Sequence, residues 1–454
     1  MSYASSSGDI RIALAGDCMP TRRLSVYDEP EYAALVAAFR AADAGFVNLE
    51  TVVRNEDEGT PSMGQGTPMT TPPALLEDLK WLGVSMVSCA NNHAFDHGEG
   101  GLLATLRHLD AAGIVHAGSG RNLAAARRPA YCDTRAGRIA LVAVTATFKP
   151  WTRAGAQRGD MHGRPGVNPL GSRTTYRVDG AAFDELRRTS RELGFDRVRA
   201  RNRNHFYSAS EAPPERAEEL ELFGQHFVRG AGFGATSAGA IDDVDGNLRS
   251  IREAKRQADW VIVSVHSHEF AQHNIAQAEN RVALTEPADF VPAFARAAVE
   301  AGADIVVGHG SHTPLGIEIY QGRPILYSLG NFVFENDTVQ AVPADAYARF
   351  GLDADATPAD FLDERSGGGT KGHGAQAGFW ESVAVRCRFA GRQLAEIELL
   401  PLDLGFGRPR SERGRPLLAG PEMAGRIIGR IERLSLRYGV TVRRDGDIGI
   451  IEVR

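Results

Sequence analysis

Short apolar runs of strand length alternate with segments of helical spacing between residues 9 and 146. The strand-like runs are "DIRIALAGD", "AGFVNLE", "VSMVSCANN" and "RIALVAVTA". The helical segments are "PEYAALVAAFRAAD", "PPALLEDLKWLG" and "GEGGLLATLRHLDAAG". This alternation is typical of βαβ units, whose parallel strands are buried on both faces. The pattern therefore predicts an α/β fold.

The alternation breaks between residues 148 and 250. The stretch "GRPGVNPLGSRTTY" has the composition of a loop, and "DELRRTSRELGFDRVRARNRNHFY" is Arg-rich and partly helical. We expect residues 148–250 to form an insertion over the active-site end of the core. The arginines are either a solvated helix face, which is the commoner case, or a rim that attracts an anionic substrate.

The strand and helix pattern returns after residue 250 with "ADWVIVSVHSHEF", "ADFVPAFARAAVEAG" and "ADIVVGHGSH". The stretch "IEIYQGRPILYSLGNFVFE" is expected to form two strands around a Gly-Arg-Pro turn. Residues 336–378 contain "SGGGTKGHG", which predicts a flexible linker or a mobile lid. Residues 379–454 supply strands, an amphipathic helix and a last hairpin that complete a single domain over residues 1–454.

Composition restricts the function classes. The net charge of −6 argues against a nucleic-acid partner, and no apolar run reaches the roughly 18 residues of a membrane span. The first residues lack the basic and apolar regions of a secretory signal. Four cysteines in 454 residues do not form a disulfide framework or a zinc motif. We expect a cytoplasmic protein with free thiols.

Polar residues of metal-binding types stand where most of the predicted core strands end. They are Asp17, Glu50, Asn92, His266, His309 and His312. The carboxyl ends of parallel strands gather at one edge of a sheet, so groups far apart in the sequence would converge there. Carboxylate, amide oxygen and imidazole ligands predict one or two divalent ions, without distinguishing Mn, Zn, Fe, Mg or Ca.

Further polar residues flank these positions. His93 can act as a proton donor, and Asp96 can hold His93 or His97 in one tautomer. Asp96 and His97 are equally well explained as the region that caps the following helix. Asn331 either lines the substrate pocket or lies in a buried strand beneath the metals. The expected outer-shell or substrate residues are Asn91, Asp96, His97, His268, Glu269 and Asn331.

Six blocks of the chain, in order, resemble one known family. They are "GDCMPTRRL", "FVNLETVV", "ANNHAFDHG", "VSVHSHEF", "GADIVVGHGSH" and "GRPILYSLGNFVFE". Together they are similar to the CapA-type, poly-γ-glutamate capsule synthesis proteins within the calcineurin-like metallophosphoesterase superfamily. The resemblance implies a four-layer αββα sandwich of two mixed sheets flanked by helices, with a metal centre that is commonly dinuclear.

The resemblance also implies roles for single residues. Asp17 matches the first metal ligand, Glu50 the bridging carboxylate, Asn92 the amide ligand and His93 the catalytic histidine. The remaining histidine ligands match His266, His309 and His312. Met19 stands where the phosphoesterases carry a histidine, so the first metal lacks one imidazole and the site is looser or mononuclear.

Several functions fit this pattern. Epimerisation of a C-terminal residue, as in some soluble CapA-like proteins of lasso-peptide tailoring, ranks slightly ahead, because the chain has no membrane span, one missing imidazole ligand and surplus histidines. Asp17 and either His309 or His312 would exchange the proton at Cα. The next alternative is metal-dependent hydrolysis or transfer at γ-glutamyl or peptide bonds, with His93 or His268 protonating the leaving amine. Phosphoester hydrolysis and a non-catalytic binding module with a structural metal rank lower. A peptide or polyglutamate-like partner is expected.

Overall fold

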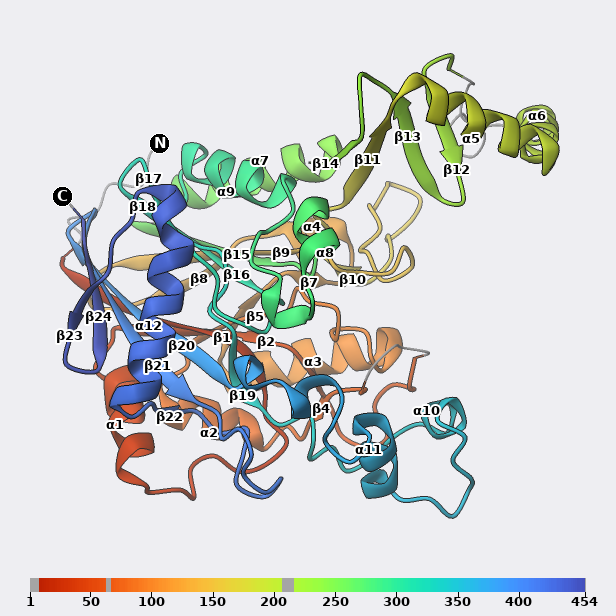
Figure 1. The fold of residues 1–454 in the computed structure, drawn as a ribbon. Coiled ribbons are helices and arrows are strands. Elements are labelled where there is room, and N and C mark those ends of the chain that lie inside the picture. The colour runs from red at the N-terminus through yellow and green to blue at the C-terminus, as the bar shows by residue number, and fades with distance from the viewer. Residues whose placement is uncertain (1–7, 63–66, 206–215, 454) are drawn as a thin grey trace. The chain divides into compact units, whose positions relative to one another are not determined.

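The computed structural model describes residues 8–62, 67–205 and 216–453, which form two compact units (Figure 1). The larger unit comprises Met1–Gly171, Ile241–Glu269 and Ala293–Arg454. The smaller unit comprises Ser172–Ala240 and Phe270–Pro292.

The larger unit contains a ten-stranded mixed sheet. Its strand order is β23 (Arg443–Asp445), β24 (Ile448–Glu452), β21 (Gln393–Asp403), β20 (Glu381–Ala390), β1 (Ile10–Met19), β2 (Ala44–Leu49), β5 (Met86–Ser88) and β6 (Val115–Ala117). Strand β19 (Asn331–Phe334) pairs with β1, and β22 (Leu417–Leu418) pairs with β21. Strand β1 runs parallel to β2 and β19 but antiparallel to β20. It therefore joins a parallel half of the sheet to an antiparallel half.

A six-stranded sheet is the second layer of strands in this unit. Its order is β17 (Ile317–Tyr320), β18 (Arg323–Leu326), β16 (Ile305–His309), β15 (Trp260–His266), β9 (Arg138–Thr145) and β8 (Ala130–Asp133). The four inner strands are parallel, and the edge strands β8 and β17 are antiparallel to their neighbours. The region expected to hold two strands thus holds three, because the chain turns at Gln321 and Gly322 and then enters β19 after Gly330.

Successive side chains along the strands point to opposite faces of the sheet, so the hydrophobic core consists mainly of two clusters. Leu14 and Phe46 of the ten-stranded sheet share one cluster with Ile262 of the six-stranded sheet. Their chain neighbours Ala13 and Val47 belong to a second cluster, which includes side chains of the helices α1 (Pro30–Arg40) and α2 (Leu75–Leu82). Both faces of the central strands are therefore buried. The prediction of an α/β fold is confirmed.

Other helices and short strands complete the larger unit. They are α3 (Gly98–Ala112), α4 (Leu123–Arg127), α7 (Ile241–Lys255), α9 (Phe290–Glu300, from Ala293 onward), α10 (Ala344–Arg349), α11 (Pro358–Ser366), α12 (Pro421–Ser435), the strand pairs β3 (Val52–Val53) with β4 (Thr70–Thr71) and β7 (Ser119–Gly120) with β10 (Gly166–Val167), and the 3-10 turns Gly372–Ala375, Ala377–Phe379 and Leu436–Tyr438. Helix α7, whose first ten residues fall inside the expected insertion, packs on β9 and β15.

The Gly-rich stretch 336–378 contains regular structure. Thr357 forms a capping box at the start of α11, and Phe361 and Leu362 of that helix are buried with Ala346 of α10. A small hydrophobic cluster of this kind orders two helices that are too short to be stable alone. The flexibility expected from the glycine content stays a prediction.

The smaller unit is built on a four-stranded sheet. Its order is β12 (Glu219–Leu222), β13 (Gln225–Arg229), β11 (Ser172–Val178) and β14 (Gly234–Gly239), and its helices are α5 (Gly180–Glu192), α6 (Phe195–His205), α8 (Gln272–Gln277) and the 3-10 turn Arg281–Ala283. Val178, Phe183, Leu220 and Leu222 form its small core. The Arg-rich stretch is helical as expected, but the loop-like stretch before it ends in strand β11.

Gly16 allows β1 to lie directly against the loop before β19. A Cβ atom at Gly16 would stand 1.8 Å from the carbonyl oxygen of Gly330, which accepts a hydrogen bond from the Asp17 amide. Since a backbone atom cannot give way cheaply, Gly16→Ala should lower the free energy of unfolding by about 3 kcal/mol, measured by chemical denaturation. The exposed Gly159→Ala is the control, because nothing lies within 4 Å of its Cβ position. An equal effect of both substitutions would contradict the close approach.

Candidate metal centre

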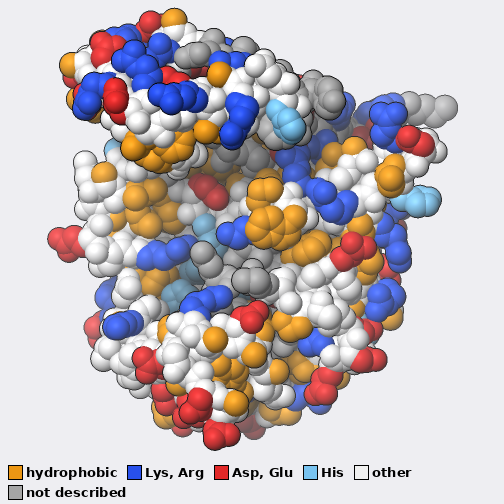
Figure 2. All heavy atoms as spheres, turned by 90° about the vertical axis from the view of Figure 1, so that its right-hand side faces the viewer, with side chains coloured by type: hydrophobic (Ala, Val, Ile, Leu, Met, Phe, Trp, Pro, Cys, Tyr) orange, Lys and Arg blue, Asp and Glu red, His pale blue; other side chains and the backbone are white. Residues whose placement is uncertain are grey.

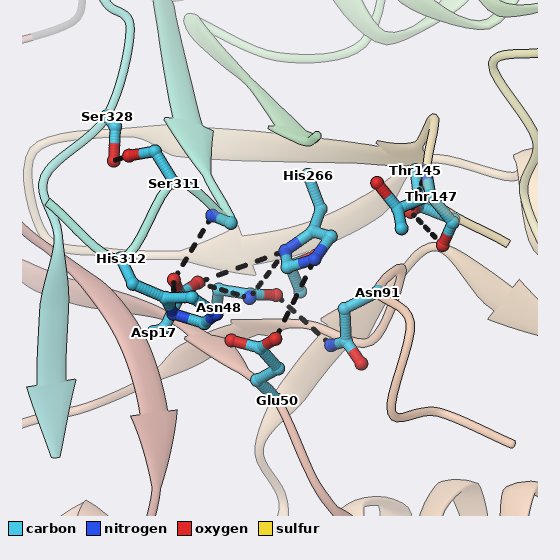
Figure 3. A network of polar contacts seen from close by, with 12 residues as sticks. Asp17, Asn48, Glu50, Asn91, Thr145, Thr147, His266, Ser311, His312 and Ser328 are labelled. Carbon is cyan, nitrogen blue, oxygen red and sulfur yellow. Dashed lines mark hydrogen bonds and ion pairs between the residues drawn. The ribbon is translucent and has the colours of Figure 1, made fainter. Parts of the chain in front are cut away.

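Polar side chains from both sheets of the larger unit meet where parallel strands end (Figure 3). Asp17 lies in β1 and pairs with Asn48 of β2, and His266 and His309 pair as the last residues of β15 and β16. Glu50 follows β2 directly. Parallel pairing brings such residues together although they are distant in the sequence.

Two groups of three side chains could each hold a metal ion, and they share Glu50. One consists of Asp17, Glu50 and His266, and the other of Glu50, His268 and His312; in each group the candidate ligand atoms lie within 4.8 Å of one another. Asp17, Glu50 and His266 are fully buried. Buried carboxylates are costly unless they are paired or bind a metal, and a carboxylate common to both groups suits either one ion or two.

Asp17 is the most heavily contacted of these groups. Its carboxylate accepts hydrogen bonds from Asn48 Nδ2 (2.8 Å) and the Gly310 amide (3.1 Å), and it lies 3.3 Å from His312 Nδ1. Burial alone would raise the pKa of Asp17, but the hydrogen bond to His312 and the nearby imidazoles hold it below its ordinary value. Asp17 is therefore an ionised ligand-type group and a weak base.

The imidazoles face one another around Glu50. His266 Nε2 lies 3.2 Å from His268 Nε2 and 3.7 Å from Glu50 Oε1. His312 Nδ1 is 2.9 Å from Asn331 Oδ1, and Asn331 also donates to the Phe379 carbonyl. A hydrogen bond that fixes one ring nitrogen leaves the other directed at a ligand, as in many metal-binding histidines.

A backbone of unusual conformation positions these rings. His312 has a left-handed φ of 61°, and Gly310 has a φ of 95°. A Cβ at Gly310 would lie 2.8 Å from the His268 ring and 3.1 Å from the His266 ring. Left-handed backbone in a residue other than glycine is costly and concentrates at functional sites.

His93 and Asp96 form a pair at the edge of the cluster. His93 Nδ1 is 2.6 Å from Asp96 Oδ2, and His93 Nε2 is 3.9 Å from Glu50 Oε1. Burial lowers the pKa of His93, but the charge and hydrogen bond of Asp96 outweigh burial and raise it above its ordinary value. His93 is therefore the imidazole of the site best suited to carry a proton.

His309 and Asn92 carry buried polar atoms without a hydrogen-bond partner among the residues that the structure describes. These atoms are both ring nitrogens of His309 and Oδ1 of Asn92. Burial lowers the pKa of His309 to about 4 and that of His266 to about 3, so both rings are neutral at pH 7. Neutral imidazole nitrogens and an amide oxygen are ligands of divalent ions, and the donor set fits such an ion.

Of the other residues expected at the site, Asn91 and Glu269 lie next to it, whereas His97 lies apart from it. Asn91 Nδ2 donates to Asn48 Oδ1 (3.2 Å), and the carboxylate of Glu269 accepts from Thr147 and Ser267. His97 is buried at the start of α3 and, within the described ranges, makes no hydrogen bond or ion pair with the cluster. Met19 is buried in β1 and supplies no imidazole.

Three residues at the site were not expected from the sequence. Asn48 Nδ2 lies 2.8 Å from Asp17 Oδ1 and 3.2 Å from His266 Nδ1. Thr147 Oγ1 accepts from the His268 amide (2.8 Å), and the ring of His373 lies 5.7 Å from that of His312. Asn48 could have been found, because it precedes Glu50 by two residues and a strand directs alternate side chains to one face.

The fold and these side chains define an α/β protein with acidic and histidine groups that could hold a metal ion. The family model of the bacterial capsule synthesis protein PGA_cap matches residues 11–336. The chain belongs to this family, which confirms the resemblance to CapA-type proteins.

Three other proteins are similar to this chain in sequence. The uncharacterized protein y4sH of Sinorhizobium fredii is 34% identical over 448 residues, which are 96% of this chain and 92% of that protein. The probable polyglutamine synthesis accessory protein MT0602 of Mycobacterium tuberculosis is 28% identical over 64% of this chain and 56% of its own length. The PGA biosynthesis protein CapA of Bacillus subtilis is 40% identical over 24% of this chain and 26% of its own length.

A solved structure, that of a hypothetical protein from Thermus thermophilus, aligns with 87% of this chain and 99% of its own, at 13% identity and a TM-score of 0.39. Within the described residues, no helix has the length and apolar character needed to cross a membrane.

Proposed function

We propose that this protein is a divalent-metal-dependent enzyme that cleaves or transfers γ-glutamyl or peptide bonds of an acidic peptide. The observation that carries the proposal is the pair of three-residue groups that share Glu50, next to the His93–Asp96 pair. The names of two relatives, a probable polyglutamine synthesis accessory protein and a PGA biosynthesis protein, favour a glutamyl substrate. In this proposal the two sheets and their helices form the four-layer αββα sandwich of metallophosphoesterases.

A metal ion would be held by Asp17, Glu50, His266, His268 and His312, with Asn92 and His309 as further donors. When bound, a divalent ion polarises a carbonyl and lowers the pKa of a coordinated water to about 7. The side chains of the cluster exclude bulk water and fix the ring orientations through Asn48 and Asn331. His93, with its raised pKa, donates a proton to the leaving amine, and Asp96 holds its ring.

The geometry favours bond cleavage or transfer over epimerisation, which the sequence alone placed slightly ahead. Epimerisation requires two proton-exchanging groups on opposite sides of Cα, and Asp17 was one candidate. The low pKa of Asp17 and its three close contacts leave it poorly suited to take a proton. Epimerisation is the second candidate, because His268 and His373 lie beside His312 and could supply the second proton-exchanging group.

One assay separates the two reactions. The metal content of the full chain is measured first, and the loaded protein is then incubated in D2O with γ-glutamyl and α-linked glutamyl peptides. We expect a new free amine to form and no deuterium to enter at Cα. Amine labelling detects the new amine, and mass spectrometry detects the deuterium. Deuterium at Cα in an uncleaved peptide would instead establish epimerisation, and neither product with metal bound would contradict both reactions.

A further inference from the structure

Two cavities of the larger unit adjoin where α4 ends. The smaller, of about 350 Å³, lies between α4 and α7, and the larger, of about 860 Å³, is bordered by α3, β6 and β8. Arg128 and Pro129, which follow α4, line both cavities, so the two make one groove, which we call the α4 groove. Each volume is in the range of small-molecule sites. None of the described residues that line this groove belongs to the candidate metal centre.

Arginines outnumber acidic residues in the α4 groove. The two acidic residues described in its lining already have partners, because Asp110 Oδ1 lies 3.0 Å from His116 Nε2 and Glu253 is paired with Arg256 (3.4 Å). At the top of Figure 2, by comparison, Lys and Arg side chains stand among Asp and Glu side chains, which is the ordinary pattern of a solvated surface. The arginines of the groove lining are Arg107, Arg121, Arg127, Arg128 and Arg249. An excess of one sign of charge on a concave surface attracts ligands of the opposite sign.

Three of these arginines carry a charge that is available to a ligand. Arg107 is paired with Glu58, since its guanidinium lies 2.8 Å from Glu58 Oε1. By contrast, the guanidinium groups of Arg121, Arg128 and Arg249 make no hydrogen bond or ion pair with any residue that the structure describes. All three side chains are exposed, and Arg128 lies where the two cavities meet.

Arg127 is held in the wall of the smaller cavity by a shared carboxylate. Its guanidinium lies 2.9 Å from Asp243 Oδ1, and that of Arg153 lies 3.1 Å from the same oxygen, so one carboxylate serves two cations. A Cβ atom at Gly246 would stand 2.2 Å from Arg127 Nη1, so α7 accommodates this guanidinium with a glycine, which weakens a helix interior. Burial lowers the pKa of Arg127; the charge of Asp243 opposes this shift, and that of Arg249 adds to it. The wall of the cavity therefore carries positive charge in excess.

We infer that the α4 groove binds an extended acidic peptide, whose successive carboxylates meet Arg249, Arg128 and Arg121. Arginines spread over two adjoining cavities suit a ligand with several charges in a row better than a single small anion. A planar guanidinium can bind each carboxylate through two parallel hydrogen bonds. The choice of a glutamyl chain as the peptide rests on the proposed function and gives its substrate a point of attachment outside the candidate metal centre.

Binding to the full chain, freed of metal by a chelator, tests the groove apart from the reaction. The probes are a labelled oligo-γ-glutamate, a chain of the same length with carboxamides in place of the carboxylates, free glutamate and a single-stranded oligothymidylate. Fluorescence anisotropy should show oligo-γ-glutamate binding about 10-fold or more tightly than the carboxamide chain, and added salt should weaken this binding. Arg128→Met and Arg249→Met should each weaken it about 10-fold, and Arg128→Lys should retain part of the affinity.

Arg252→Met is the matched control, because Arg252 is an exposed arginine of α7 that is not among the residues lining either cavity. This substitution removes the same charge from the same helix and should change the affinity by less than about twofold. Thermal unfolding confirms that each variant is folded.

Four results would overturn the inference. They are equal binding of the carboxamide chain, binding of free glutamate as tightly as the oligomer, tighter binding of oligothymidylate, and full affinity in a folded variant that carries both Arg128→Met and Arg249→Met. Amine release by the metal-loaded chain would leave the proposed function in place in each of these cases. Conversely, binding that depends on Arg128 in a chain that releases no amine when loaded with metal would support the groove and refute the reaction.

Discussion

Replacing Glu50 by Gln should abolish turnover and greatly weaken metal binding while the chain stays folded. Glu50 is fully buried and is common to both candidate ligand groups, so the substitution removes the charge that either ion would share. The loss of metal affinity and rate should exceed the loss of about 10–100-fold that follows from changing a residue that only supports a metal ligand. Metal content of the purified variant and its rate in the peptide assay measure the effect.

Asn48→Ala is the matched control for this experiment. Asn48 touches Asp17 and His266 but offers no carboxylate, so its removal should cost only about 10–100-fold in metal affinity or rate. Glu50→Gln keeps the size and shape of the side chain, so its circular dichroism spectrum should match that of the unmodified protein. Full metal occupancy in this variant would remove Glu50 from the metal centre.

The free energy of unfolding of the metal-free chain should fall as the pH is lowered from about 6.5 to about 3. His266 and His309 are neutral in the folded state because burial lowers their pKa values to about 3 and about 4. In the unfolded chain both titrate near 6.5, so the unfolded state binds more protons below that pH and is favoured. Each imidazole contributes on the order of 3 kcal/mol over this range. Above pH 7 the contribution is constant.

Denaturant titrations between pH 8 and pH 4 measure this dependence. His309→Gln should flatten the curve, because the variant no longer has one of the two depressed groups. His162→Gln, at an exposed histidine, should leave the curve unchanged. If the stability of the unmodified chain were the same at pH 7 and pH 4.5, the two buried rings would not be neutral as described.

The strands of the core could be predicted because they are continuous apolar runs. The runs that contain β1, β9, β15 and β16 are buried on both faces over most of their length, so few polar positions interrupt the apolar pattern. Strand β11 was missed because its sequence "SRTTYRV" has exposed arginines and a half-buried face. Its pairing with β13 and β14, and not its composition, makes it a strand.

The candidate site could be predicted as a set of strand ends, but its internal contacts could not. Asp17, Glu50 and His266 were expected to meet, and the structure brings them together. Which nitrogen of His312 faces Asn331 depends on a left-handed backbone conformation that the sequence "GHGSH" does not reveal. Likewise, His373 comes from a Gly-rich stretch whose helices depend on a small cluster of packed side chains.

The pairing of the first strand, β1, with the late strand β20 affects how the chain folds during synthesis. The first half of β1 pairs with β20, so that Ile10 lies opposite Phe389, and synthesis proceeds from the amino end. While most of the polypeptide emerges from the ribosome, this edge of β1 has no partner, and an open apolar edge favours association with other chains. We expect fragments that end before β20 to aggregate or to be held by chaperones, and folding to become cooperative only when β20 and β21 have been made.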